Sequence, residues 1–320
     1  MSKLWTVRLP AFIQAHICRC DGPTDRTDRK RTHSKPGDMG TAGAAASEHT
    51  SSQIASPDHE LVERAAVLRR CFLTEEGWTP AISYAGITCF YQRALKGQGI
   101  VRVRAEAEVD APLFDLASLF YEVDLWHRWA PTFGSLGLKR ARVLGSQGPL
   151  RLVCQLEAKL PWPFRHRSCI FAAEAVDCLV PGDPHQQIVI SMDSRRVAAV
   201  CPDLPAVEAD GVVADMMDCG LILTPGEVAG TRGTLVQGVL NVDPHMYVPD
   251  WLLAISSMNL CILVILQWRR AAHLARTPEY LDISCDPQNP FYMHVRRRMA
   301  ESFPAELALA PPLHVASEKG

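Results

Sequence analysis

The chain has 320 residues, of which 48% are hydrophobic and 21% charged, and its formal net charge is −2. This near-neutral charge gives no sign of nucleic-acid binding, which needs a strongly basic surface. The 11 cysteines are odd in number and include no CxxC pair, a usage typical of a reducing compartment rather than of a disulfide framework. Cys18, Cys20 and His16 lack a matching second pair of ligands, so no metal site is expected.

Residues 1–55 are predicted to be a disordered leader. The stretch from Cys20 to Gln53 nearly lacks large apolar residues, so it cannot bury enough surface to offset the entropy lost on ordering. Residues 1–20 are more apolar, but Pro10 interrupts them before an apolar core of signal-peptide length forms. Basic residues between 26 and 31 favour an organelle transit sequence, whereas acidic residues between 21 and 28 oppose it.

The folded part is expected to begin near Ser56, where Ser-Pro-Asp-His-Glu is a helix start followed by an apolar stripe to Phe72. Beyond Pro80 the apolar residues alternate with a period of two, and a short helix follows Pro112. Strands are predicted over 82–92, 101–109 (with one solvated face), 150–157, 167–179, 187–195, 212–223 and 231–243, with turns at 181–184 and 225–227.

A long helix is predicted for the segment Val248–Arg270. Pro249 suits the first turn, and basic residues near the other end favour a helix C-terminus. One face carries Trp251, Ile255, Met258, Ile262, Ile265 and Trp268. A membrane span is the alternative, because residues 251–266 carry no charge and a span needs roughly 20 apolar residues. Three polar residues between 256 and 259 favour a helix buried along a sheet instead.

The order of these elements predicts an α+β fold. An antiparallel sheet that curls around a long helix leaves a space between them, and apolar side chains line it. Such a space is a cavity for an apolar ligand.

Three segments carry a resemblance to a known family. They are Glu122–Pro131 (EVDLWHRWAP), Pro161–Arg167 (PWPFRHR), and Gly238–Pro244 followed by Val248–Leu253. In this order and spacing they resemble StAR-related lipid-transfer (START) domains over roughly residues 76–276, although Ser168 stands where that family usually has an aspartate. The resemblance implies a helix-grip fold, in which a curved antiparallel sheet wraps around a long C-terminal helix. It also implies non-catalytic binding of a sterol, phospholipid or related lipid, with intermembrane transfer or sensing as the role.

The candidate ligand-binding residues combine this resemblance with side-chain chemistry. Either Asp215 or Asp218 is expected to point inward and to pair with Arg167 or Arg195, since an unpaired charge in an apolar cavity is costly. Methionines suit an adaptable lining, while the tryptophans also fit ordinary core packing. The candidates are Trp126, Trp129, Arg167, Met192, Arg195, Met217, Asp218, Trp251, Ile255, Met258 and Ile262.

Neither catalysis nor a cofactor is expected, because the sequence contains no GxSxG, GxGxxG, GxxxxGK[ST] or HExxH motif. Two alternatives stay open: an enzyme of the cyclase or hydrolase type on the same scaffold, and a membrane-anchored START-like protein. An enzyme would need titratable groups that converge in the cavity.

Residues 277–320 are predicted to be a C-terminal extension with a short helix from Pro290 and a disordered tail. This helix either packs back on the domain or rests on an anionic membrane surface. The expected partners are a lipid ligand and, transiently, a membrane surface, with no nucleic acid. The expected location is cytoplasmic and peripheral to membranes, and the oligomeric state is left open.

Overall fold

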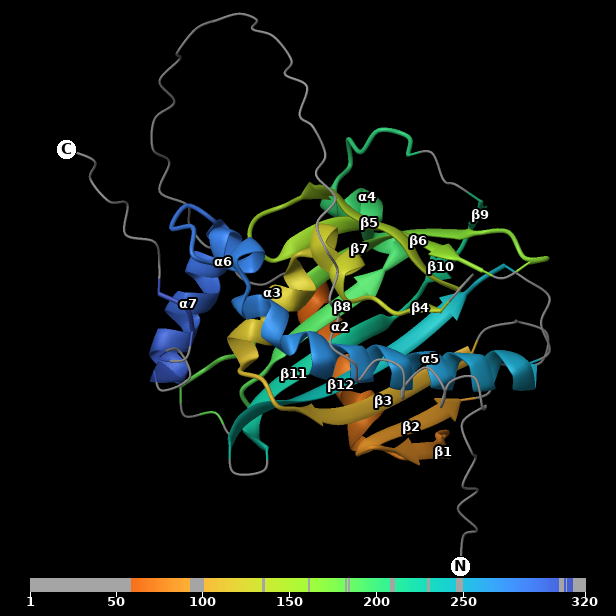
Figure 1. Ribbon diagram of the computed structural model, residues 1–320, viewed down its shortest axis with the longest axis horizontal. Coiled ribbons are helices and arrows are strands. Elements are labelled where there is room, and N and C mark those ends of the chain that lie inside the picture. The colour runs from red at the N-terminus through yellow and green to blue at the C-terminus, as the bar shows by residue number, and fades with distance from the viewer. Residues whose placement is uncertain are drawn as a thin grey trace, which may run out of the picture. The chain divides into compact units, whose positions relative to one another are not determined.

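One sheet of twelve strands organises the computed structural model (Figure 1). The structure describes residues 59–92, 101–133, 136–160, 162–181, 183, 185–207, 211–228, 231–245, 250–304, 308 and 310–312. In spatial order the strands are β1 (Thr79–Tyr84), β2 (Ile87–Gln92), β3 (Val101–Val109), β12 (Thr231–Asp243), β11 (Cys219–Val228), β8 (Ile188–Asp193), β7 (Arg167–Asp177), β6 (Arg151–Lys159), β5 (Leu136–Ser146) and β4 (Thr132–Phe133). Neighbours along this path are antiparallel, and two short strands lie off it: β10 (Asp215–Met216) on β12 and β9 (Val212–Val213), parallel, on β7.

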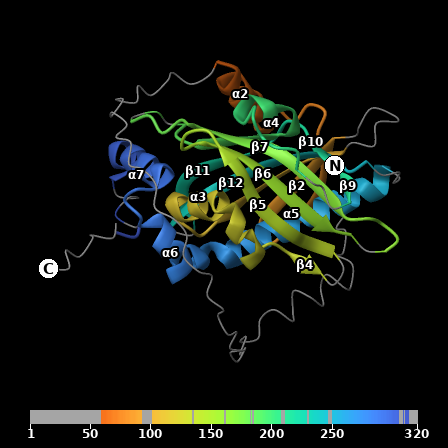
Figure 2. The same ribbon diagram turned by 90° about the horizontal axis from the view of Figure 1, so that it is seen from above.

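Helices cover both faces of this sheet (Figure 2). We call the face that carries α5 the inner face and the opposite one the outer face. The inner face carries α3 (Leu113–Tyr121), η1 (Val123–Arg128), α5 (Asp250–Ala271), η3 (Ala272–Arg276), α6 (Pro278–Ser284) and α7 (Pro290–Ser302). The outer face carries α2 (His59–Leu73), η2 (Ser194–Arg196) and α4 (Val197–Val200).

The long helix α5 lies along the inner face, as predicted. Ile262, Ile265 and Trp268 are buried in the core, and Met258 packs against it. The predicted stripe is therefore correct for the C-terminal half of the helix, whereas the side chains of Trp251 and Ile255 lie outside the described residues. Within the part of the chain that the structure describes, no helix combines the length and apolar character that a membrane span needs.

Ion pairs attach α2 to the outer face. The carboxylate of Glu174, on β7, is fully buried, and Nη1 of Arg64 on α2 lies 2.9 Å from its Oε2. Nε of Arg196 approaches the same oxygen at 3.2 Å. Arg64 also donates to Oγ of Ser191 at 2.6 Å and lies 3.6 Å from Asp193. These contacts join α2 to β7 and β8 and to the turn that follows β8.

Arg104 corrects the expectation that β3 has one solvated face. Its side chain is buried, with Nη1 donating to the carbonyl oxygens of Cys71 and Thr74 at the end of α2. The guanidinium also lies 4.2 Å from the ring centroid of Phe90 and 5.0 Å from that of Trp78. Hydrogen bonds and aromatic faces together stabilise the buried cation.

Several strand boundaries differ from the prediction. The segment 82–92 is a hairpin, because Ala85 and Gly86 both have positive φ and form a two-residue turn. Segment 212–223 is broken before β11 at Asp218, whose φ is 52°. Residues 225–227, predicted as a turn, continue β11 against β12. Pro225 is tolerated there since β8 pairs with β11 only as far as Leu223.

The C-terminal helix α7 packs back on the fold. Asn289 caps it by accepting a hydrogen bond from the Phe291 amide at 3.1 Å, and Pro290 occupies the first turn. Phe291, Tyr292, Val295 and Met299 are buried. The predicted leader, the Cys18, Cys20 and His16 group and the last part of the predicted tail lie outside the described residues.

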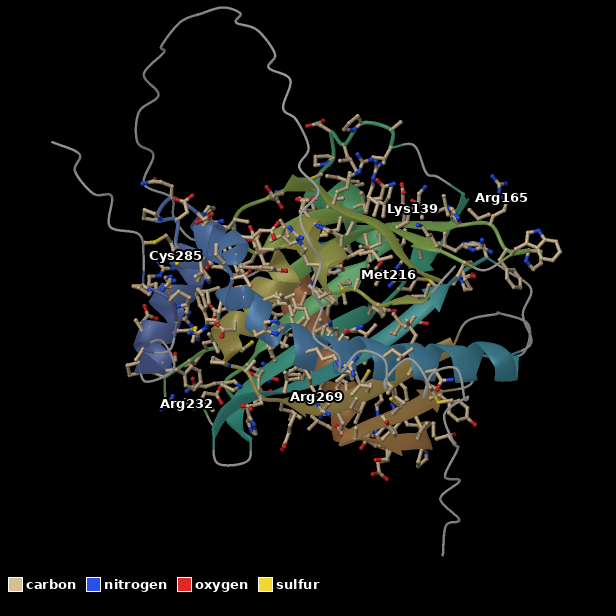
Figure 3. The ribbon with its side chains drawn as sticks, in the orientation of Figure 1. Lys139, Arg165, Met216, Arg232, Arg269 and Cys285 are labelled. Atoms are coloured by element: carbon tan, nitrogen blue, oxygen red, sulfur yellow. The ribbon has the colours of Figure 1, made fainter. Side chains whose placement is uncertain are left out.

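At the opposite end of the sheet from α7, the turn between β6 and β7 is solvent-exposed and aromatic. Trp162 is 92% exposed, and Phe164 is 43% exposed. Arg165 lies beside them at this tip, far from Cys285 near α6 (Figure 3). The structure thus has a basic, aromatic tip at one end and α7 at the other.

Candidate functional site

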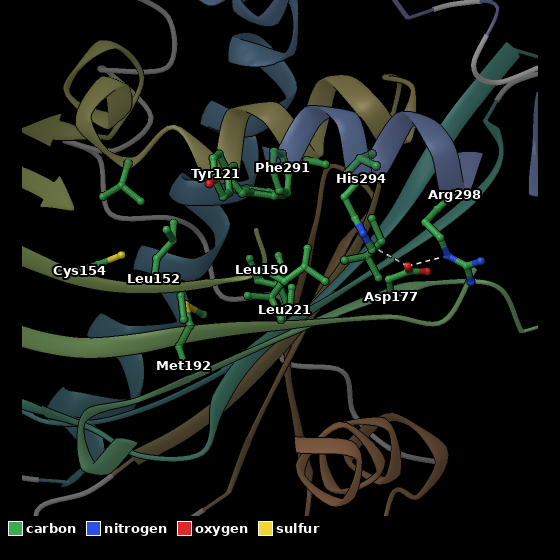
Figure 4. Close-up of a pocket in the computed structure, with 18 of the residues that line it drawn as sticks. Tyr121, Leu150, Leu152, Cys154, Asp177, Met192, Leu221, Phe291, His294 and Arg298 are labelled. Carbon is green, nitrogen blue, oxygen red and sulfur yellow. Dashed lines mark hydrogen bonds and ion pairs between the residues drawn. The ribbon is translucent and has the colours of Figure 1, made fainter. Parts of the chain in front are cut away.

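A cavity of about 80 Å³ lies between the inner face of the sheet and the helices α3, η1 and α7. Its floor comes from strands β6, β7, β8 and β11, and its roof from the helices (Figure 4). The strand side chains include Leu152, Cys154, Phe171, Met192 and Leu221. The helix side chains include Phe120, Tyr121, Trp126, Phe291 and Val295. The lining is predominantly apolar.

The floor follows from the alternation of side chains along the strands. On β6, Leu152 and Cys154 point inward, while Val153 packs on the outer face with Val200 of α4. On β7, Ala173 and Ala175 also point inward. Their register partners are larger: Leu152 and Met192 lie beside Ala173, and Ile190 lies beside Ala175. Two small side chains between larger ones leave the floor hollow.

One end of the cavity is polar. Oδ2 of Asp177, at the end of β7, accepts a hydrogen bond from Nε of Arg298 at 2.7 Å and lies 3.0 Å from Nε2 of His294 (Figure 4). Oδ1 of Asp177 accepts from the Leu179 amide at 3.0 Å. Burial alone would raise the pKa of Asp177, but the hydrogen bonds from His294 and Arg298 outweigh it, so the pKa is lowered. Asp177 is therefore an ionised, fully hydrogen-bonded carboxylate.

Two further titratable groups lie at the end of α3, and one of them, Tyr121, lines the cavity. Burial raises the pKa of the Tyr121 hydroxyl to about 12. Burial also raises the pKa of Glu122, although the hydroxyl of Tyr292 donates to its Oε1 at 2.8 Å and partly opposes that shift. The Tyr121 hydroxyl, which lines the cavity, therefore stays protonated at neutral pH.

Among the predicted binding residues, the cavity is lined by Trp126 and Met192. Nε1 of Trp126 donates to the Phe120 carbonyl at 3.2 Å, which fixes the ring against η1. Trp129 lies beneath it in the core, with ring centroids 5.5 Å apart. Ile262 and Met258 belong to the core under α5 and are not among the residues that line the cavity.

The charged candidates lie elsewhere. Nη2 of Arg195 is 2.6 Å from Asp193 and 2.7 Å from Asp218, but the Arg195 and Asp218 side chains are 58% and 49% exposed. The expectation of an inward-facing pair is therefore wrong, because the break at Asp218 turns that carboxylate to the surface. Asp215 likewise pairs with His245 at the surface, at 2.8 Å.

Arg167 and Met217 have structural contacts outside the cavity. Nε of Arg167 donates to the Pro244 carbonyl at 2.5 Å, and its Nη1 donates to the Arg165 carbonyl at 2.7 Å. Met217 is half-buried beside β12, where its amide donates to the Asn241 carbonyl at 3.0 Å. Both residues join segments at the edge of the inner face, and neither lines the cavity.

The sequence interpretation missed Asp177, His294 and Arg298. A usable signal was present, because His294 and Arg298 are four residues apart and so share one side of a helix. Asp177 is an acid near the end of a predicted strand. Only the fold brings the helix to that strand end.

The lining offers little for covalent chemistry. Burial raises the pKa of the Cys154 thiol to about 12, so this thiol is protonated at neutral pH and is a weak nucleophile. The described lining contains no serine, threonine or lysine. No group of three or more candidate metal ligands gathers within the described residues.

The fold itself is that of a helix-grip protein. No protein-family model and no curated protein matches the sequence. Among solved structures, human STARD10 superimposes with a TM-score of 0.57 at 18% identity, covering 78% of this chain and 91% of that one. Human StAR-related lipid transfer protein 5 gives a TM-score of 0.50 at 11% identity, covering 68% and 99%. The predicted α+β helix-grip fold of the START type is confirmed.

Proposed function

We propose that the protein binds a hydrophobic ligand, a sterol, phospholipid or related lipid, in the cavity and releases it chemically unchanged. The observation that carries this proposal is an apolar cavity between the sheet and the helices of a START-type fold. Burial of acyl or ring surface against such a lining is favourable in proportion to the area removed from water. Human StAR-related lipid transfer protein 5, which shares the fold, is named for lipid transfer, and this supports the same class of function here.

Transfer requires contact with a membrane, and the tip between β6 and β7 suits that contact. The Trp162 side chain is almost fully exposed, and tryptophan prefers the boundary between lipid headgroups and acyl chains. Arg165 beside it would be attracted to anionic lipids. We infer that this tip touches the membrane transiently, from the cytoplasmic side. A reducing compartment is supported by the nine cysteines in the described part of the chain, all of which are free.

A second candidate function, an enzyme on the same scaffold, is favoured by one observation. Asp177 and His294 form a titratable pair at the polar end of the cavity. A general base of this kind could remove a proton from a bound ligand. The binding function fits better, since both Asp177 oxygens are already engaged by three donors and the Cys154 thiol stays protonated.

Native mass spectrometry of the purified full-length chain tests the proposal. We expect a bound species whose mass is that of an intact lipid, released on denaturation. The protein should also take up a fluorescent phosphatidylcholine or sterol saturably, with one ligand per chain, and return it unaltered. Failure to retain or take up any lipid would refute the binding function, and turnover that Asp177→Asn abolishes would establish the enzyme instead.

A further inference from the structure

The cavity is smaller than the ligand class proposed for it. Its volume is about 80 Å³, whereas ligand pockets for drug-sized molecules span roughly 300–1,000 Å³. A membrane lipid therefore fits only if side chains that now fill the space move away. The question is which wall can move.

Helix α7 is the wall whose movement displaces no other described helix. It comes last among the helices of the described chain, so it can shift without carrying another described helix with it. By contrast, α3 has eight of its nine residues buried and connects directly to β3 and η1. Phe291 and Val295 of α7 line the cavity and close it on the side away from the sheet.

Polar contacts hold α7 to the sheet at one end of the cavity. Both His294 and Arg298 bind Asp177, and Nη2 of Arg298 also donates to the Leu179 carbonyl at 2.7 Å. We call Asp177, His294 and Arg298 the α7 latch. Oγ of Ser302 adds a hydrogen bond to the same carbonyl at 2.8 Å. The latch thus joins α7 to the end of β7 and the residues directly after it.

We propose that α7 is a lid over the ligand cavity. Opening of the α7 latch lets α7 move, and part of the ligand then occupies the space that Phe291 and Val295 fill in the closed state. This inference rests on the proposed lipid-binding function and adds to it how the site is opened for the ligand.

Stopped-flow uptake of a fluorescent phosphatidylcholine from phosphatidylcholine vesicles tests the lid. Arg298→Ala and His294→Ala weaken the latch, and Arg297→Ala is the matched control because Arg297 lies on the same helix with its side chain exposed. We expect Arg298→Ala to speed both uptake and release about tenfold. The reason is that opening the latch would no longer break a hydrogen bond between charged groups, whose free energy corresponds to at least about that factor. Arg297→Ala should leave both rates within about twofold of the wild type, as surface substitutions usually do.

The outcomes separate the lid from the binding function. If no variant and no wild-type protein takes up lipid, the binding function fails. If the wild type binds but Arg298→Ala has unchanged rates, the lid is refuted and the binding function survives. Should Arg298→Ala unfold, hydrogen exchange on the wild-type chain decides: amides from Tyr292 to Met299 are expected to exchange faster with lipid bound. Equal exchange in the free and loaded protein would overturn the proposal.

Discussion

The rings of Tyr121 and Phe291 are stacked, with centroids 3.6 Å apart and planes 2° from parallel. Tyr121 is the last residue of α3, whereas Phe291 lies in the first turn of α7. This contact joins two helices that are distant in the sequence, and it forms part of the cavity lining. Aromatic pairs contribute roughly 0.5–1.5 kcal/mol beyond the area that they bury.

Phe291→Ala is expected to reduce the free energy of unfolding by about 3–5 kcal/mol, because it removes a buried ring and leaves a void. The same void enlarges the ligand space, so lipid capacity should rise while stability falls. Urea denaturation and equilibrium lipid binding measure the two effects. Met293→Ala, at an exposed position on the same helix, is the control and should change stability by less than about 0.5 kcal/mol.

Ala175→Phe should have the opposite effect on the cavity. Ala175 lies in the hollow of the floor, so a phenyl ring there takes up the space that the ligand needs. Overpacking should cost about 1–3 kcal/mol, whereas lipid uptake should be abolished. Gln267→Ala on α5, outside the lining, should leave uptake intact. Normal uptake by Ala175→Phe would place the ligand somewhere other than this cavity.

The pH dependence of stability should show the contribution of Asp177. Its pKa in the folded protein is below the ordinary value of 3.8, so its ionised form is stabilised by folding. That contribution is fully present above the unfolded pKa and is lost as the pH falls through the folded pKa. Urea denaturation should therefore show Asp177→Asn to be less stable than the wild type near pH 7. The gap should narrow below about pH 4. A gap that stays constant to pH 2 would contradict the ionised latch.

Trp162→Ala should weaken binding to anionic vesicles without changing the melting temperature. The Trp162 side chain is 92% exposed, so folding buries little of it and its loss should cost little stability. Vesicle co-sedimentation measures the loss. Leu73→Ala is the matched control, because Leu73 is 83% exposed but lies at the end of α2 on the outer face. Equal losses for the two variants would show that the tip has no special role.

Glu174→Ala is expected to destabilise the protein by about 3–5 kcal/mol, the usual cost when one partner of a buried ion pair is removed. The reason is that Arg64 and Arg196 would lose the buried carboxylate that they share. Thermal unfolding measures the loss. Glu63→Ala, at an exposed position on α2, is the control and should have a small effect. Equal shifts in melting temperature for the two variants would show that the loss of the shared carboxylate is not the cause.

The sequence predicts a strand best where aliphatic and β-branched residues are concentrated and a proline follows. The strand over 231–243 has the predicted bounds: Leu235, Val236, Val239, Leu240 and Val242 lie inside it, and Pro244 comes directly after its last residue. In contrast, β5 (Leu136–Ser146) was not predicted. Lys139, Arg140 and Arg142 obscure its alternation, and its register against β6 shifts twice, between Leu138 and Arg140 and between Val143 and Gly145.

The cavity was harder to predict than the fold. Met192 stands on a strand that the patterns predict, whereas Trp126 lies on η1, which they do not predict, and became a candidate through the family resemblance; both line the cavity. The latch depends on α7 folding back, which brings His294 within 3.0 Å of Asp177 across 117 positions of sequence. Periodicity describes one element at a time, so it cannot show which helix closes a sheet. The break at Asp218 is a left-handed backbone residue that no apolar pattern indicates.

The contacts of Arg64 and Arg104 determine where the chain can be cut for expression. The resemblance to START domains spans roughly residues 76–276, and a fragment with those ends would lack α2. Glu174 and Asp193 would then lose Arg64, and Arg104 would lose the carbonyl oxygens of Cys71 and Thr74. An apolar strip of β8, β11 and β12 would also be uncovered. Such a fragment should aggregate. A fragment that begins at or before His59 keeps α2, and with it the cover over this strip. Ligand measurements on a shortened protein should therefore use such a fragment rather than one that begins near residue 76.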